Sequence, residues 1–279
     1  MTKSNLHPLL FKLLALALGL AGVSALRAQE TPAPDQAAQA AELAKKLSNP
    51  VAALISVPFQ FNADYGIGAN NGTRYLTNIQ PVIPIDLNPE WNLISRTILP
   101  VIVQDDVVGS SSQSGIGDVL QSVFFSPKAP TADGLIWGAG PVLLLPTASD
   151  KVLGGGKWAA GPTVLFLKQQ NGWTKGILAN HLWSFAGDSS RNSINATYHQ
   201  PFLSYGGISP GLTVGGSFEA TYDWRAKQWT IPFVPNVSQV MKLGGQLVSF
   251  SAGVKIYLEK PPGGPDWGLR IGATLLFPK

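Results

Sequence analysis

The chain of 279 residues contains no cysteine, 30 glycines and 22 prolines, and only 13% of its residues are charged. The lack of cysteine excludes disulfide bonds and thiolate metal sites. The formal net charge is +4, but Lys3, Lys12 and Arg27 lie in the first 28 residues, which hold no acidic side chain, so 17 basic and 16 acidic residues remain beyond them. This balance gives no electrostatic footprint for DNA or RNA, and we expect no nucleic-acid partner.

Residues 1–28 have the pattern of a signal peptide. Two lysines precede an apolar run from Leu13 to Ala25, which is shorter than the roughly 20 residues that a membrane-spanning helix needs. Small residues follow, and cleavage is predicted after Ala25 or Ala28. The mature chain is therefore expected to be exported, with an uncleaved membrane anchor as the alternative.

Residues 29–50 are predicted to form a periplasmic linker with a short helix. Asp35 can cap this helix, which is rich in alanine, continues to about Lys46 and is followed by Asn49 and Pro50. The helix can act as a plug for the next domain or as a periplasmic handle, and a frayed tail is the third interpretation.

Residues 51–279 contain alternating runs of about ten residues separated by turn-forming sequences, a pattern typical of β-strands. The runs, an even number, are Ala53–Phe61, Arg74–Ile85, Trp91–Val103, Asp118–Ser126, Leu135–Leu145, Lys157–Lys168, Trp173–Phe185, Ser193–Tyr205, Leu212–Trp224, Gln228–Val240, Gln246–Leu258 and Trp267–Phe277.

The runs place apolar and polar side chains on opposite faces. In the last run, one face carries Trp267, Leu269, Ile271, Ala273, Leu275 and Phe277, and the other carries Gly268, Arg270, Gly272 and Thr274. A soluble sheet must bury its apolar face against a core, whereas lipid covers the apolar face of a closed barrel in a membrane.

The connections, the tryptophans and the prolines help to decide between a soluble sheet and a membrane barrel. Long connections mostly alternate with tight turns, and tryptophans lie mainly at run ends, as in outer-membrane barrels. Prolines inside the runs argue against a barrel, because a proline has no backbone N–H and so removes a hydrogen-bond donor from the strand pairing. We predict an all-β fold: a closed antiparallel transmembrane β-barrel of about 12 strands over residues 51–279, with a short N-terminal helix. A secreted soluble sandwich is the alternative.

Strand parity directs seven polar side chains to the interior of the predicted barrel: Arg74, Asn78, Gln80, Arg96, Glu219, Lys255 and Arg270. A charge on the lipid side costs about 2–4 kcal/mol near the midplane, so the inward orientation follows once a barrel is assumed. These residues can form a selective constriction that draws polar or anionic solutes. Alternatively they pair, Glu219 with Lys255 or Arg270, and fill a narrow interior.

Residues 42–279 resemble a family of outer-membrane transporters related to the phenol meta-pathway degradation proteins, whose members are sometimes mislabelled neuromedin U. The stretches that carry the resemblance are "ELAKKLSNPVAALISVPFQFN", "NIQPVIPIDLNPEWNLISRTILPVIVQDD", "SGIGDVLQSVFFSPKAP", "WAAGP" and "WGLRIGATLLFPK". The resemblance implies a barrel that passes small molecules, aromatic or hydrophobic compounds among them. It carries over no catalytic residue.

An outer-membrane lipid hydrolase is an alternative function, and it needs a hydroxyl nucleophile, a histidine base and an amide or carboxylate. His181 and His199 are the candidate bases, with Asn180, Ser184 and Asn195 on the same runs. Asn180 and His181 point to opposite faces of a strand, so they cannot share a site without a bulge. We assign no catalytic residue, although the alternative predicts Ser184 or another hydroxyl within hydrogen-bond distance of either histidine.

The sequence indicates no cofactor and no metal. The glycine-rich stretch Ser114–Asp118 precedes no helix that would present its dipole to a phosphate. Asp105, Asp106 and Asp118 lack the spacing of a calcium-binding loop, so a solvated acidic loop is the simpler interpretation.

Together these features predict an outer-membrane channel or transporter of a Gram-negative cell. Its expected partners are outer-membrane lipid, a small-molecule solute, and the barrel-insertion machinery through the C-terminal strand that ends near Phe277. A structural or adhesion barrel without transport is a further alternative.

Overall fold

The computed structural model describes residues 34–278, so the predicted signal peptide lies outside the described residues. The chain divides into two units, residues 1–39 and residues 40–279, and the fold described below is that of the second. Helix α2 (Pro34–Leu47) extends over the boundary between them. No helix in the described part of the chain is long and apolar enough to cross a membrane.

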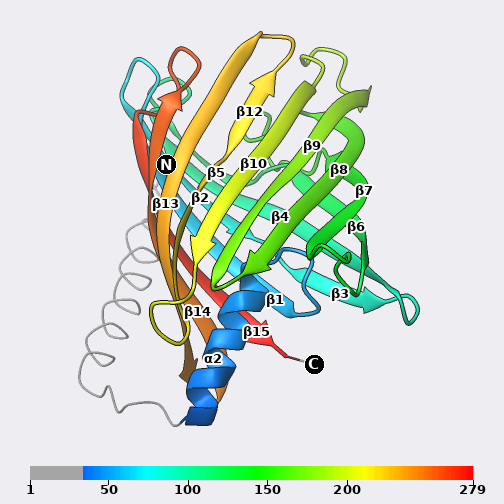
Figure 1. The fold of residues 1–279 in the computed structure, drawn as a ribbon. Helices are drawn as coiled ribbons and strands as arrows, with labels where there is room; N and C mark the ends of the chain where they lie inside the picture. The colour runs from blue at the N-terminus through cyan, green and yellow to red at the C-terminus, as the bar shows by residue number, and fades with distance from the viewer. Residues whose placement is uncertain (1–33, 279) are drawn as a thin grey trace, which may run out of the picture. The chain divides into compact units, whose positions relative to one another are not determined.

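The second unit is a closed antiparallel β-barrel of 12 strands (Figure 1). Consecutive strands pair with each other, and β15 pairs with β1 from Ile55↔Phe277 to Tyr65↔Trp267, which closes the sheet. The segments are β1 (Ile55–Ile67), β2 (Gly72–Ile79), β3 (Val82–Asp86), β4 (Trp91–Asp105), β5 (Ser112–Ile116), β6 (Val119–Pro127), β7 (Leu135–Leu145), β8 (Lys157–Gln170), β9 (Trp173–Gly187), β10 (Asn195–Tyr205), β11 (Leu212–Phe218), β12 (Ala220–Asp223), β13 (Gln228–Leu243), β14 (Gln246–Glu259) and β15 (Trp267–Phe277). Segments β2 and β3, β5 and β6, and β11 and β12 each form one passage together. The predicted fold class is confirmed.

Bends and bulges accommodate prolines within the strands. Between β2 and β3, Pro81 has no N–H to donate, while the Gln80 N–H still bonds to the Pro58 carbonyl at 2.8 Å. On β13 the register with β14 shifts between Ile231 and Pro232. Such irregularities bend a strand without opening the sheet.

Large apolar side chains cover the outside of the barrel. Exposed examples are Phe59, Phe125, Phe166, Ile177, Val254, Leu269 and Ile271. Buried polar side chains on the inward face include Asn62, Asp64, Gln104, Thr163, Ser249 and Lys255. This arrangement is the reverse of a soluble protein and is the one that lipid requires.

Exposed tryptophans lie at or near strand ends: Trp158, Trp173, Trp183, Trp224 and Trp267. Tryptophan prefers the membrane–water interface because its ring is apolar and its N–H is polar. Some polar groups on the outer face bond to one another: the Thr97 hydroxyl lies 2.6 Å from Gln121 Oε1, and the Gln121 amide donates to Ser95 Oγ at 3.1 Å.

At the barrel end away from the C-terminus, strands extend further than the sequence predicts. Strand β1 continues to Ile67 and β2 begins at Gly72, so most of a predicted long loop is strand. Segment β5 likewise occupies part of the next predicted loop. The connection over residues 146–156 is irregular, as expected.

The orientation of the two faces predicts that a new charge lowers stability much more on the outer face than on the inner face. Ile271 is exposed in the middle of β15, so Ile271→Lys is expected to lower the free energy of unfolding by about 2–4 kcal/mol. Ser251 lines the interior, and Ser251→Lys should cost much less. Urea unfolding in lipid vesicles, followed by tryptophan fluorescence, measures both, and equal losses would contradict the assignment of faces.

Candidate functional site

All seven polar residues predicted for the lumen lie on the inward face. Directly opposed residues of antiparallel strands share a face, and the register joins Gln60 to Asn78 and Asp64 to Arg74. Lys255 is buried, with 7% of its surface exposed. An interior cavity is lined by the other four: Gln80, Arg96, Glu219 and Arg270.

Lys255 and Asp64 form a buried ion pair. Lys255 Nζ lies 2.7 and 2.9 Å from the two oxygens of Asp64, and each side chain is 8% exposed. The Tyr257 hydroxyl also donates to Asp64 Oδ1, at 2.9 Å. Asp64 thus accepts three hydrogen bonds, which offset much of the cost of removing its charge from water.

Arg270 and Glu219 form the second ion pair of the lumen. The contact is bidentate, with Nη1–Oε1 and Nη2–Oε2 distances of 2.5 and 2.9 Å, and Arg270 Nε donates to Asn62 Oδ1 at 2.7 Å. Glu219 lies between β11 and β12, so the pair reaches over the intervening strands β13 and β14. Of the two partners considered for Glu219 from the sequence, Arg270 is the one observed.

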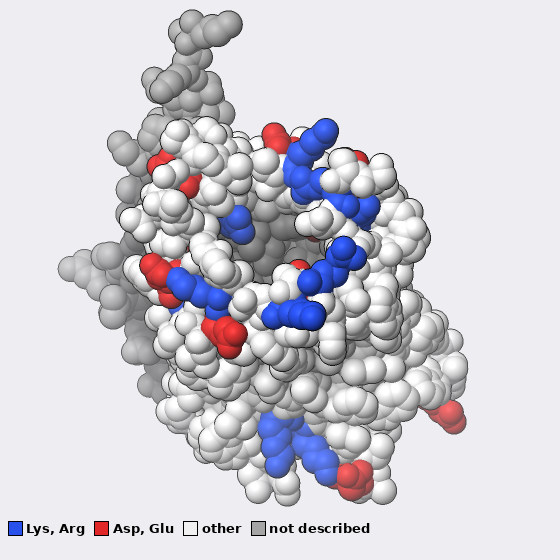
Figure 2. Space-filling view, turned by 90° about the horizontal axis from the view of Figure 1, so that it is seen from above, with Lys and Arg blue, Asp and Glu red and all other residues white. Residues whose placement is uncertain are grey.

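The other two inward arginines have amides as partners. Arg74 Nε donates to Gln104 Oε1 at 2.9 Å, and Arg96 Nη2 donates to Gln80 Oε1 at 2.9 Å. Neither arginine forms an ion pair within residues 34–278. Seen from above, the barrel has a hollow with Lys and Arg side chains around its mouth (Figure 2).

Sequence reasoning missed several members of this lumen: Asn62, Asp64 and Gln104. The first predicted run ends at Phe61, so residues 62–65 fall in a predicted long connection. The period of two nevertheless continues there, since Gln60, Asn62 and Asp64 alternate with Phe59 and Phe61. That alternation is the signal that identifies Asp64 as inward-facing.

Residues 40–54, here called the floor, lie within the end of the barrel where the C-terminus is found (Figure 1). Leu43 forms a buried cluster with Leu276 of β15. Further along the floor, Val51 forms another cluster with Phe124 of β6. The floor therefore contacts two different walls, which favours the plug among the three interpretations of the helix.

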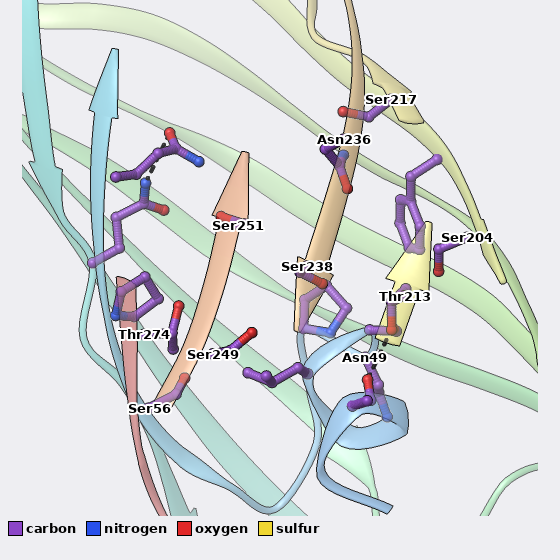
Figure 3. A pocket seen from close by; sticks show the side chains of 18 of the residues that line it. Asn49, Ser56, Ser204, Thr213, Ser217, Asn236, Ser238, Ser249, Ser251 and Thr274 are labelled. Atoms are coloured by element: carbon purple, nitrogen blue, oxygen red, sulfur yellow. Dashed lines mark hydrogen bonds between the residues drawn. The ribbon is translucent and has the colours of Figure 1, made fainter. Parts of the chain in front are cut away.

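A cavity of about 380 Å³ lies between the floor and the Arg270–Glu219 pair. Hydroxyl groups from several strands surround it (Figure 3). They belong to Ser56, Ser204, Thr213, Ser217, Ser238, Ser249, Ser251 and Thr274. The register explains their proximity, since Ser238 is directly opposite Thr213 on one side and Ser251 on the other. The volume falls within the range of small-molecule pockets.

The cavity also has an apolar wall, which the sequence did not predict. Val82, Leu178 and Phe202 line it, and all three pack in a cluster that includes Ile94 and Phe124. The interior is thus divided. Most of the hydroxyls that line the cavity lie on β1, β11 and β13–β15, with Ser204 on β10 as the exception, and the apolar cluster lies on β3, β4, β6 and β8–β10.

His181 faces outward and makes two polar contacts. Its Nδ1 lies 2.7 Å from Thr197 Oγ1 and its Nε2 lies 3.0 Å from Asn195 Oδ1. Ser184 is not its partner, because Ser184 Oγ instead accepts the N–H of residue 194. The hydroxyl contact expected of a hydrolase is therefore present with Thr197, whose oxygen also accepts the Trp224 Nε1 proton at 2.8 Å.

Asp118, considered as a cation ligand, has a structural partner. Its carboxylate accepts the N–H groups of Ala148 and Gly155, at 3.1 and 2.6 Å, and so holds the connection between β7 and β8. Within the described residues, no group of three or more His, Cys, Asp or Glu side chains is placed to hold a metal ion.

The sequence matches no family model and no curated protein. Among solved structures, the COG4313 outer membrane channel from Pseudomonas putida F1 is similar, with a TM-score of 0.63 and 17% identity over 80% of this chain and 94% of that chain. The fold is that of an outer-membrane β-barrel. The link to phenol meta-pathway proteins stays a prediction.

Two other barrels are less similar in structure. Outer membrane phospholipase A from Escherichia coli has a TM-score of 0.45 and 9% identity over 80% of this chain and 92% of that chain. The β domain of the Bordetella autotransporter Brka has a TM-score of 0.44 and 11% identity over 81% of this chain and 100% of that chain.

The buried pair Lys255–Asp64 predicts a large effect of removing one partner. Asp64→Asn leaves a buried ammonium without a counter-charge and should lower the free energy of unfolding by about 3–5 kcal/mol. Adding Lys255→Met should recover much of that loss. Urea unfolding in vesicles measures both variants.

Asp133 provides the matched control. It pairs with Lys168 in an exposed loop, where hydrogen bonds from Lys168 and Thr131 lower its pKa to about 2. Asp133→Asn should change stability little, because exposed pairs contribute little. A loss as large as that of Asp64→Asn would show that burial is not the cause.

Proposed function

We propose that this protein is an outer-membrane channel that lets small molecules pass by diffusion. The observation that carries the proposal is a hollow interior lined by charged and hydroxyl side chains, inside a wall whose outer face is apolar. In this proposal the chain is exported by its signal peptide and inserted through the C-terminal strand that ends near Phe277. Outer-membrane lipid then surrounds the apolar face.

The interior favours solutes with both polar and apolar parts. The Arg270–Glu219 pair restricts the lumen from one side of the cavity and the floor restricts it from the other. Aromatic or hydrophobic compounds of small size would meet the wall that contains Phe202. In the proposed mechanism, passage requires the floor to shift, since its leucines close one end of the cavity.

Single-channel recording of the refolded protein in a planar bilayer tests the proposal. We expect a low chloride conductance from the full protein, because the floor closes one end of the cavity. We expect a conductance about twofold or more higher from a variant that lacks residues 34–47, because half of the floor is gone. Glu42→Gln is the control, since its pair with Lys46 is exposed. If neither the full protein nor the deletion variant conducts, a structural or adhesion barrel becomes the better proposal.

A lipid hydrolase is the second candidate, because Thr197, His181 and Asn195 lie in the order hydroxyl, imidazole, amide on the lipid-facing side. Two features weigh against it: threonine is a secondary alcohol, and the Trp224 N–H already occupies its oxygen. Neither Thr197→Ala nor His181→Ala is expected to change fatty-acid release from phospholipid vesicles, measured against empty vesicles. Release that both substitutions abolish would favour the enzyme.

A further inference from the structure

The charges around the interior cavity are not balanced. Three cationic side chains, Lys46, Arg96 and Arg270, line it together with one carboxylate, Glu219. Arg270 takes both oxygens of Glu219, and Lys46 lies at 3.9 Å from Glu42 on the exposed side of the helix. Arg96 is therefore the cation without a carboxylate among the described lining residues.

Arg96 has unused capacity for hydrogen bonds. A guanidinium carries five N–H donors, and only the contact from Nη2 to Gln80 is formed within residues 34–278. Arg96 is attracted to the Glu219 carboxylate only at longer range, because Arg270 takes both oxygens of that carboxylate. A charge held away from bulk water without a direct ion pair is costly, so an anion that reaches Arg96 is stabilised there. The fork of donors matches the two oxygens of a carboxylate.

The hydroxyl wall offers further donors and acceptors. Seven of its members make no side-chain hydrogen bond within the described residues: Ser56, Ser204, Thr213, Ser238, Ser249, Ser251 and Thr274. None of their oxygens is among the fully buried side-chain atoms that lack a hydrogen-bond partner within the described residues. Their hydrogen-bonding groups therefore point to the space that a solute would fill (Figure 3).

The position of Arg96 relative to the apolar wall restricts the solute further. Arg96 is directly opposite Val82 in the register between β3 and β4, and Val82 packs against the cluster that includes Leu178 and Phe202. A molecule whose anionic end meets Arg96 thus places its other end on these apolar side chains. A neutral polyol would satisfy the hydroxyls but would leave the charge of Arg96 without a partner.

We propose that the cavity is a binding site for small monocarboxylates with an apolar body, such as aromatic acids. This inference rests on the proposed channel function. Arg96 holds the carboxylate, the wall of Val82, Leu178 and Phe202 contacts the body, and the serine and threonine hydroxyls bind polar substituents. The site lies part-way along the channel, and a solute that binds there loses hydrating water and gains these contacts.

Calorimetric titration of the refolded protein in detergent tests the site directly, with benzoate as the probe. Benzamide has the same ring without the charge, acetate has the charge without the ring, and glucose represents a neutral polyol. We expect benzoate to bind about tenfold or more tightly than each of the other three, since a charged hydrogen-bonded contact changes affinity by that order.

The decisive variant is Arg96→Gln, which should weaken benzoate binding about tenfold or more, with Arg96→Lys intermediate. Arg74→Gln is the matched control: Arg74 also bonds to a glutamine but does not line the cavity, so its loss should leave benzoate binding unchanged. Unaltered heat-dependent mobility on SDS gels verifies that each variant is folded.

Several results would overturn the inference. They are benzamide or glucose binding as tightly as benzoate, an unchanged affinity in Arg96→Gln, an equal loss in Arg74→Gln, and no benzoate binding at all. Calorimetry needs no conduction, so the outcome is independent of the bilayer recordings. If the protein conducts chloride but does not bind benzoate, the binding site is contradicted and the channel is not. If it binds benzoate but does not conduct, the channel is contradicted and the binding site is not.

Discussion

The pairing of β1 with β15 is the contact on which the rest of the barrel depends. Eleven consecutive residue pairs, from Ile55↔Phe277 to Tyr65↔Trp267, join the first strand to the last. In hydrocarbon an unpaired backbone N–H or C=O costs several kcal/mol, so an open edge of this length cannot exist there. Closure removes the edge and also separates an interior from an exterior. The alternation of each strand then places polar side chains inside and apolar side chains outside.

Charged side chains avoid the lipid by pointing into the closed barrel, but burying a charge there also costs free energy. The lumen offsets part of this cost with two ion pairs: Asp64 accepts three hydrogen bonds, and Arg270 meets Glu219 through two. Buried ion pairs contribute less to stability than well-packed apolar groups would. They do connect segments that lie far apart in the sequence: Lys255 and Asp64 are 191 residues apart, and Arg270 joins β15 to the junction of β11 and β12.

The sequence allowed the strands to be predicted well, because the period of two is local. The bounds of Leu135–Leu145 and Trp267–Phe277 agree with β7 and β15, and the inward orientation of Lys255 and Arg270 follows from parity. Parity says which face a side chain takes, but not which strand lies opposite it in the lumen. The partner of Lys255, the apolar cluster around Phe124 and the path of the floor were therefore not predictable, since each depends on barrel curvature and on contacts between remote strands.

In the proposed channel, the division of the interior into two walls links the stability of the barrel to the passage of a solute. The apolar cluster at Val51, Ile94 and Phe124 and the one at Leu43 and Leu276 both use the floor as one of their surfaces. Moving the floor exposes these side chains to water, at a free-energy cost of about 25 cal/mol for each Å² of apolar surface. A solute with an apolar body can cover part of that surface as it enters, whereas a small ion cannot. In the proposed channel, the floor opposes free ion flow through the same burial that stabilises the barrel, and we expect it to move most readily for molecules that replace the contacts of its leucines.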